Sequence, residues 1–158
     1  MAISAMQAAK AACAASGWAL SNLQLHKILY IAHMIYSGRH DGEPLINDER
    51  FQAWPYGPVL PSVYKYASSY GSSNIQNIFN HIPDLDPSTE EGQIIIDAVG
   101  RLGSLEPFRL VDITHEPISA WAHSYVPGMR NVPIEQEMII NEYRERFPTI
   151  EPWAKERA

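Results

Sequence analysis

Six histidines are the residues of this chain that could bind a metal ion or transfer protons. His26 and His33 lie seven positions apart in an apolar segment, so on one helix they would be about 10 Å apart along the axis, too far to share an ion. The sequence contains neither a His-x-x-x-His pair nor a His-Glu-x-x-His motif. We therefore expect no metal site, and we expect His26 and His33 to be hydrogen-bonded in a packed interior.

Side chains for covalent catalysis are equally scarce. The single cysteine, Cys13, lies in an Ala-rich stretch, where a thiol usually packs as a small apolar group, and one cysteine excludes an internal disulfide. The sequence has no Gly-x-Ser-x-Gly motif and no glycine-rich phosphate loop, so we expect no cofactor and no enzymatic activity. Two alternatives stay open: a small hydrolase that uses His115 with Glu116, or one that uses His26 with Tyr30.

Two clusters of rare residue types stand out instead. The first is aromatic and stiffened by prolines, and the second combines a hydroxyl, an imidazole and an indole. Aromatic side chains on a stiff loop lose little entropy on binding and dominate many interfaces, but the same rings could cover the core. The first cluster contains Trp54, Tyr56, Gly57, Pro58, Val59 and Tyr64, and the second contains Thr114, His115 and Trp121.

Length and composition predict one globular domain over residues 1–158. The chain has 158 residues, 46% of them hydrophobic, which is enough for a core without disulfides. It has 18 acidic and 12 basic residues and a net charge of −6, without a Lys/Arg cluster, so we expect no nucleic-acid partner. No run of 18 apolar residues exists, so we expect a soluble cytoplasmic protein without membrane contact.

The elements that must position these clusters are mostly helical. All prolines lie at or after Pro44, which leaves the first 43 residues free to form helices. Ser4 with Gln7 and Ser21 with Gln24 match capping boxes, and Gly17 and Gly38 are suitable helix ends. The second helix, about residues 21–38, is apolar nearly all round. We therefore expect it to lie at the centre of a helical bundle.

Shorter elements follow. We expect a small β-hairpin near residues 44–54, with strands near 44–46 and 51–54, and then an aromatic-rich loop. Further helices are predicted from Pro61 to Gly71, from residue 88 to Gly103, from Pro107 and from Pro133, with a helical turn near 75–79.

The two clusters and the second helix carry a family resemblance. Leu25-His26-Lys27-Ile28-Leu29-Tyr30 resembles the Leu-x-Lys-Leu-Leu-Tyr helix of the Panacea domain, the SocA-like, phage-associated GepA-type antitoxin family. Residues 42–59 with Val63 and Tyr64 resemble the central motif of this family, and Thr114-His115 with Trp121 resembles its later element. The family often has a proline before this Trp, where Ala120 stands in this chain.

The resemblance spans roughly residues 4–147 and implies the antitoxin of a type II toxin–antitoxin system. Such a protein binds and neutralises a toxin encoded nearby, either by direct occlusion or as an adaptor that delivers the toxin to an ATP-dependent protease. Because the resemblance covers nearly the whole chain, we expect no separate DNA-binding domain. A phage-associated interaction protein with another host target is the alternative. The residues that this resemblance marks as structural or partner-binding are Leu25, Lys27, Leu29, Tyr30, Trp54, Tyr56, Gly57, Pro58, Val59, Tyr64, Thr114, His115 and Trp121.

Overall fold

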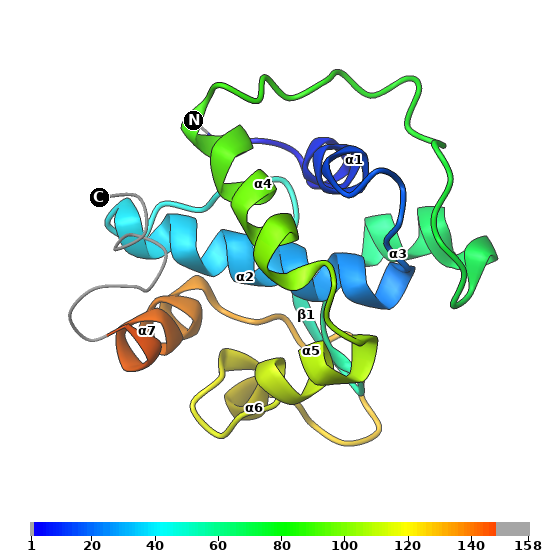
Figure 1. Ribbon diagram of the computed structural model, residues 1–158. Helices are drawn as coiled ribbons and strands as arrows, with labels where there is room; N and C mark the ends of the chain where they lie inside the picture. Colours follow the sequence, from blue (N-terminus) through cyan, green and yellow to red (C-terminus); the bar gives the residue numbers. More distant parts are fainter. Residues whose placement is uncertain (1, 148–158) are drawn as a thin grey trace.

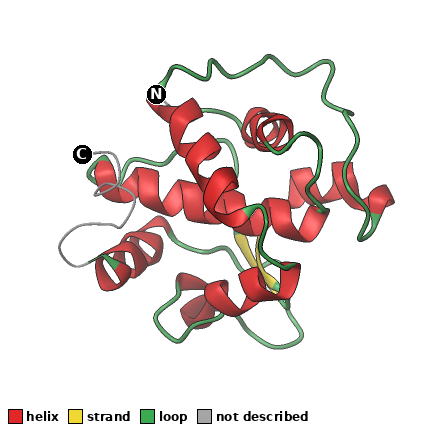
Figure 2. Ribbon diagram, in the orientation of Figure 1, coloured by secondary structure: helices red, strands yellow, loops and turns green. Residues whose placement is uncertain are grey.

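The computed structural model describes residues 2–147, and this part of the chain is mainly α-helical with one two-stranded antiparallel sheet (Figures 1 and 2). This confirms the predicted fold class. The elements are α1 (Ala5–Ala15), α2 (Asn22–Arg39), β1 (Gln52–Trp54), β2 (Gly57–Val59), α3 (Pro61–Ala67), the 3₁₀ turn η1 (Ser68–Tyr70), α4 (Glu90–Leu102), α5 (Pro107–Thr114), α6 (Ala120–Ser124) and α7 (Gln136–Arg146).

Helix α2 is the centre of the fold, as its apolar sequence predicts. It begins with a complete capping box, in which the Gln24 amide donates to Ser21 Oγ and the Ser21 amide donates to Gln24 Oε1. Every residue from Gln24 to Ser37 is buried. Figure 1 shows α1 and α4 on one side of α2 and α5, α6 and α7 on the other. The neighbouring elements therefore bury α2 on both of these sides, which accounts for its buried central stretch.

Helix α1 lies against both α2 and α4. Ser4 caps its start by accepting a hydrogen bond from the Gln7 amide at 3.0 Å, but the Gln7 side chain bonds the Asp84 carbonyl, so only half of the predicted capping box forms. The buried face of α1 consists of small residues, which let the backbones of the neighbouring helices approach closely. As predicted, the chain leaves α1 next to Gly17, which has a φ of 70°.

The predicted end of the second helix is correct to within one residue, but Gly38 is not the residue that stops it. Helix α2 continues to Arg39, and the chain reverses at Asp41 and Gly42, which have φ angles of 52° and 89°. Gly38 has a different role: a Cβ atom at this position would collide with the ring of Tyr143 on α7. The glycine thus provides space for a helix–helix contact rather than a turn conformation.

The predicted hairpin is present, but its strand pairing differs. β1 confirms the predicted strand near 51–54, and its partner is β2, with Trp54 opposite Gly57, rather than the segment near 44–46. Ile46 instead forms a parallel bridge with Ile3. The segment after Trp54, predicted to be a loop, therefore contains a turn and a strand, because Gly57 adopts a φ of 115° that closes the hairpin.

Two helix predictions need correction and three are confirmed, one of them the helix predicted from residue 88 to Gly103, which is α4. Residues 75–79 are not helical; Ile75 and Phe79 are buried anchors of an irregular segment. The last helix begins at Gln136 rather than at Pro133, because Pro133 still bridges to Gln52 of the sheet. The helices that start at Pro61 and Pro107 form as predicted.

A buried histidine makes the stability of the fold sensitive to acid. His33 bonds Gln136 Oε1 through Nε2 at 2.9 Å and accepts the Ile46 amide hydrogen at Nδ1, which requires a neutral ring. Burial lowers the pKa of His33 from 6.5 to about 4. The unfolded chain therefore binds a proton first as the pH falls below 6.5, and stability is lost toward pH 4.

We expect the free energy of unfolding of the wild type to fall by about 2 kcal/mol more than that of His33→Gln between pH 6.5 and 4.5. Urea denaturation followed by circular dichroism at several pH values measures this difference. His123→Gln, which changes an exposed histidine, is the control and keeps the wild-type slope. Equal slopes for wild type and His33→Gln would contradict the assignment.

Candidate functional site

Three segments that are far apart in the sequence meet at Gly57. The Lys27 ammonium of α2 donates a hydrogen bond to the Pro58 carbonyl at 3.1 Å. A Cβ atom at Gly57 would lie 2.8 Å from Lys27 Cε and 2.9 Å from the Thr114 hydroxyl oxygen at the end of α5. Glycine is therefore required here both by the positive φ and by the close packing of Lys27 and Thr114 against the hairpin.

Lys27 is a buried cation without a nearby carboxylate. Its side chain is fully buried, and within residues 2–147 no acidic side chain forms an ion pair with it. Burial lowers the pKa of Lys27 from 10.5 to about 7. At neutral pH the amine thus exists in comparable amounts of its charged and neutral forms, and an approaching anion would favour the charged form.

An aromatic stack lies beside this lysine. The His115 ring lies 3.6 Å from the Trp121 ring at an angle of 6°, and Trp121 donates its indole N–H to the Trp54 carbonyl at 2.6 Å. Burial and then the Lys27 charge lower the pKa of His115. Its Nε2 atom is buried and has no hydrogen-bond partner within residues 2–147. The stack therefore ties α5 and α6 to the hairpin and leaves one buried polar atom unsatisfied.

A groove of about 510 Å³ opens above this junction. Its walls come from the first turns of α2, from the hairpin, from α3 and from the loop before α7. The Trp54 ring lines it, 4.8 Å from the Tyr64 ring and 4.0 Å from the Arg130 guanidinium carbon. At the rim, Tyr56 is 60% exposed and contacts Phe108, which is 64% exposed. We call this concave surface with its two rim aromatics the aromatic groove.

The predicted site residues fall into three sets. Leu25, Leu29 and Tyr30 belong to the core, where the Tyr30 hydroxyl donates to Glu142 Oε1. The residues that support the groove from below or behind are Gly57, Pro58, Thr114, His115 and Trp121. The residues that line the groove are Lys27, Trp54, Tyr56, Val59 and Tyr64.

Several residues of the aromatic groove were not among the predicted site residues, and His26, Arg130 and Phe108 are three of them. His26 was predicted to be a hydrogen-bonded residue of the interior. This is confirmed, because its buried ring bonds Asn22 Oδ1 and the Leu60 amide, but the residue also lines the groove. Arg130 and Phe108 carried no local signal, since each becomes informative only through a contact made across the fold. A search for aromatic and cationic residues near turns would have included Arg130, because it lies two residues after Gly128, a residue type that is common in turns.

The two residue pairs considered for a hydrolase do not come together in the structure. Glu116 forms an ion pair with Arg146 at 2.6 Å, while His115 stacks on Trp121. His26 is held by Asn22 and Leu60, while the Tyr30 hydroxyl bonds Glu142, and burial is the main cause that raises the Tyr30 pKa. Each member thus has a different partner, and no hydrogen bond joins an acid to a base within either pair.

Cysteine and metal chemistry find equally little support. Burial raises the pKa of Cys13 to about 12, so its thiol stays protonated and unreactive at neutral pH. Residues 2–147 contain no cluster of three or more His, Cys, Asp or Glu side chains suited to hold a metal ion. Within the same range, no helix is both long and apolar enough to cross a membrane.

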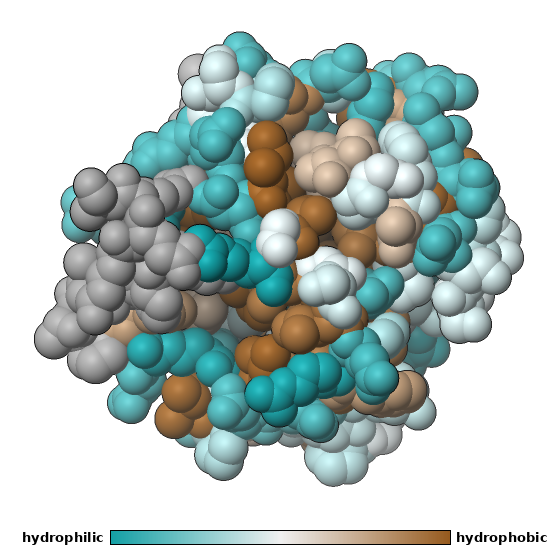
Figure 3. Space-filling model, in the orientation of Figure 1, coloured by the Kyte–Doolittle hydropathy of each residue, from teal (hydrophilic) through white to brown (hydrophobic). Residues whose placement is uncertain are grey.

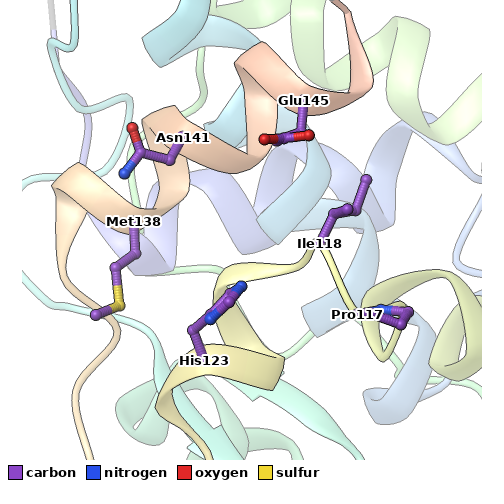
Figure 4. A pocket seen from close by; sticks show the side chains of 6 residues that line it. All are labelled: Pro117, Ile118, His123, Met138, Asn141 and Glu145. Atoms are coloured by element: carbon purple, nitrogen blue, oxygen red, sulfur yellow. The ribbon is translucent and has the colours of Figure 1, made fainter.

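Two other hollows contain none of the predicted site residues. One, of about 370 Å³, lies between α6 and α7, where Figure 4 shows His123 and Met138 facing each other from the two helices. The other, of about 460 Å³, lies between α1 and α4 and includes Ala11 and Ile96. Figure 3 shows apolar surface over α4 at the centre of its view. The aromatic groove is therefore the hollow in which the sequence clusters converge.

Comparisons with known proteins match the part of the chain that contains these clusters. A family model described as "Antitoxin SocA-like, Panacea domain" matches residues 25–122, a range that holds Lys27, the hairpin and Trp121. Antitoxin SocA of Caulobacter vibrioides (strain NA1000 / CB15N) is 35% identical over 117 residues, which is 65% of this chain and 58% of that protein. This chain therefore spans less than two thirds of the curated relative that it matches. No solved structure matches the chain.

We expect Lys27→Met to remove a pH dependence of stability. Because the unfolded lysine binds more protons than the folded one between pH 7 and 10.5, the wild type should gain about 2 kcal/mol relative to Lys27→Met from pH 7 to 9. The same gain is lost as the pH falls back toward 7. Chemical denaturation at pH 7, 8 and 9 measures it, with Lys65→Met, which changes an exposed lysine, as control. A pH-independent difference would show that Lys27 is not the titrating group.

Proposed function

This chain belongs to the SocA-like, Panacea-domain antitoxin family, and we propose that it acts as the antitoxin of a type II toxin–antitoxin system. In this role it binds a protein toxin encoded nearby and neutralises it through direct protein–protein contact. The toxin is its partner, and the reaction is a stoichiometric association in which no covalent bond forms or breaks.

The observation that carries this proposal is the aromatic groove. Residues of α2 and of the aromatic cluster line it, Thr114, His115 and Trp121 support it, and neither pair considered for a hydrolase forms an acid–base hydrogen bond. Tyr56 and Phe108 stand together on its rim with most of their surface exposed. Exposed aromatic pairs of this kind are typical of interaction sites, because burying them against a partner releases much free energy.

We further propose that the described fold binds the toxin without a separate DNA-binding domain. The net charge of −6 opposes contact with phosphates, and the aromatic groove offers two cations, Lys27 and Arg130, rather than a basic stripe. An electrophoretic mobility shift with the promoter of the chain's own gene at physiological salt tests this proposal. A specific shift by the isolated chain would refute it.

Neutralisation has two modes that lead to different outcomes in cells. If the chain covers the active surface of the toxin, it protects cells that lack ATP-dependent proteases. If it is an adaptor that delivers the toxin to such a protease, it fails in those cells and toxin levels rise. The two modes are separated by co-expressing the chain and the toxin in cells with and without ATP-dependent proteases and following toxin abundance by immunoblot.

We expect the double variant Tyr56→Ser with Phe108→Ser to lose growth rescue and to bind the toxin at least about tenfold more weakly. Both side chains are mostly exposed, so the free energy of unfolding should change by no more than about 0.5 kcal/mol per site. The measurements are growth rescue, co-purification with the adjacent gene product, and thermal denaturation.

The matched control is Ile118→Ser with Met138→Ser, which removes two exposed apolar side chains from the hollow between α6 and α7. This control should retain rescue. If it loses rescue while the Tyr56 and Phe108 variant keeps it, the toxin binds at the other hollow. If the wild type neither rescues growth nor co-purifies with the toxin, the proposed function itself is refuted.

A further inference from the structure

The aromatic groove carries positive charge in an acidic protein. The chain as a whole has a net charge of −6, but among the described residues the charged side chains that line the groove are Lys27 and Arg130. No aspartate or glutamate of the described part of the chain lines it. The groove is therefore positively charged although the protein as a whole is negatively charged. This local positive charge favours a partner that presents negative charge to the groove.

Lys27 lines the groove with a fully buried side chain, and most of its hydrogen-bonding capacity is unused. An ammonium group has three N–H donors, and within residues 2–147 one of them has an acceptor, the Pro58 carbonyl. A buried cation without a carboxylate is unfavourable, because its lost hydration is not replaced by an opposite charge. Gly57 lets the hairpin backbone pack directly against the lysine, because a Cβ atom there would lie 2.8 Å from Lys27 Cε and 3.3 Å from its Nζ.

Arg130 provides the second cation at the mouth of the groove. Its guanidinium carbon lies 4.0 Å from the Trp54 ring centroid, so the ring face holds the cation in place while its edge N–H groups stay available. Within residues 2–147 no hydrogen bond or ion pair engages this guanidinium. A guanidinium stacked on an indole is oriented to bind a carboxylate at its edge.

Apolar surface surrounds the two cations. Trp54, Tyr56, Val59 and Tyr64 supply most of the lining, so an occupant must bring apolar side chains as well as charge. A phosphate backbone would meet two cations and no further basic residue, which is too little for nucleic acid. An acidic side chain flanked by aromatic or aliphatic side chains satisfies both features of the groove.

We propose that the aromatic groove binds a segment of the partner toxin in which a Glu or Asp side chain stands between aromatic or aliphatic residues. The carboxylate binds Arg130 at the mouth and is attracted by the buried Lys27, and the flanking side chains pack on Trp54, Tyr56 and Tyr64. This inference rests on the proposed function, because it names the chemistry that the toxin presents to the antitoxin.

The chemistry of the groove can be tested without the toxin. The probes are the pentapeptide Ser-Phe-Glu-Phe-Ser with both ends blocked, its Ser-Phe-Gln-Phe-Ser counterpart, and the Gln peptide with a free terminal carboxylate. Titration of the isotope-labelled full chain, followed through the Trp54 indole N–H signal, gives the three affinities. We expect the blocked Glu peptide to bind about threefold to tenfold more tightly than the other two.

Charge reversal at the exposed Arg130 tests the same contact with little risk to the fold. Arg130→Glu should abolish the preference for the Glu peptide over the Gln peptide. Arg144→Glu on α7 makes an identical charge change at another exposed arginine and should keep the preference. A preference for Glu that survives in Arg130→Glu would overturn the proposal, as would equal binding of the blocked Glu and Gln peptides. Tighter binding of the free terminal carboxylate, or displacement of the Glu peptide by a short oligothymidylate, would also overturn it.

The final arm uses the complex with the toxin. Arg130→Glu should weaken toxin binding about tenfold, and replacing one acidic toxin residue by arginine should restore it. If the chain neutralises the toxin and Arg130→Glu has no effect, the inference about the groove fails and the proposed function stands. If the chain never binds the toxin but selects the Glu peptide, the proposed function fails while the groove keeps its chemistry.

Discussion

The fold depends on the complete burial of a helix that carries polar side chains. Residues Gln24 to Ser37 of α2 are all buried, so their polar side chains need partners, since an unpaired buried polar group is costly. Partners from outside the helix come from residues 58–60, from Ile46 and from α7, among other parts of the chain, and the bonds fix the positions of these parts. The bonds run from His26 to the Leu60 amide, from Lys27 to the Pro58 carbonyl, from Tyr30 to Glu142, from His33 to Gln136 and the Ile46 amide, and from Ser37 to Gln136.

The aromatic groove is a by-product of the same constraint. His26 and Lys27 pull the hairpin onto the first turns of α2, and this places Trp54 and Tyr56 at the surface next to α3. Trp121 then ties α6 to the Trp54 carbonyl. The binding surface and the core are therefore one connected arrangement. A substitution in the supporting residues changes the shape of the groove even when it leaves the lining residues intact.

The sequence predicted those features that depend on local chemistry. The capping box at Ser21, the proline starts at Pro61 and Pro107 and the all-round apolar helix each follow from residues close together in the chain. Features that depend on distant contacts were missed or misplaced. Gly38 looks like a helix end until the ring of Tyr143 is known to pack against it. The same holds for the groove, whose aromatic half was visible in one short segment while Arg130 and Phe108 came from elsewhere.

The order in which α2 receives its partners has a consequence for synthesis on the ribosome. Glu142 and Gln136 of α7, the last helix of the described range, bond Tyr30, His33 and Ser37 of α2. While α7 is still inside the exit tunnel, the central helix lacks these partners and cannot complete its burial. The nascent chain therefore carries the polar side chains of α2 without these partners until α7 has left the tunnel, and it is open to cellular proteases for that period.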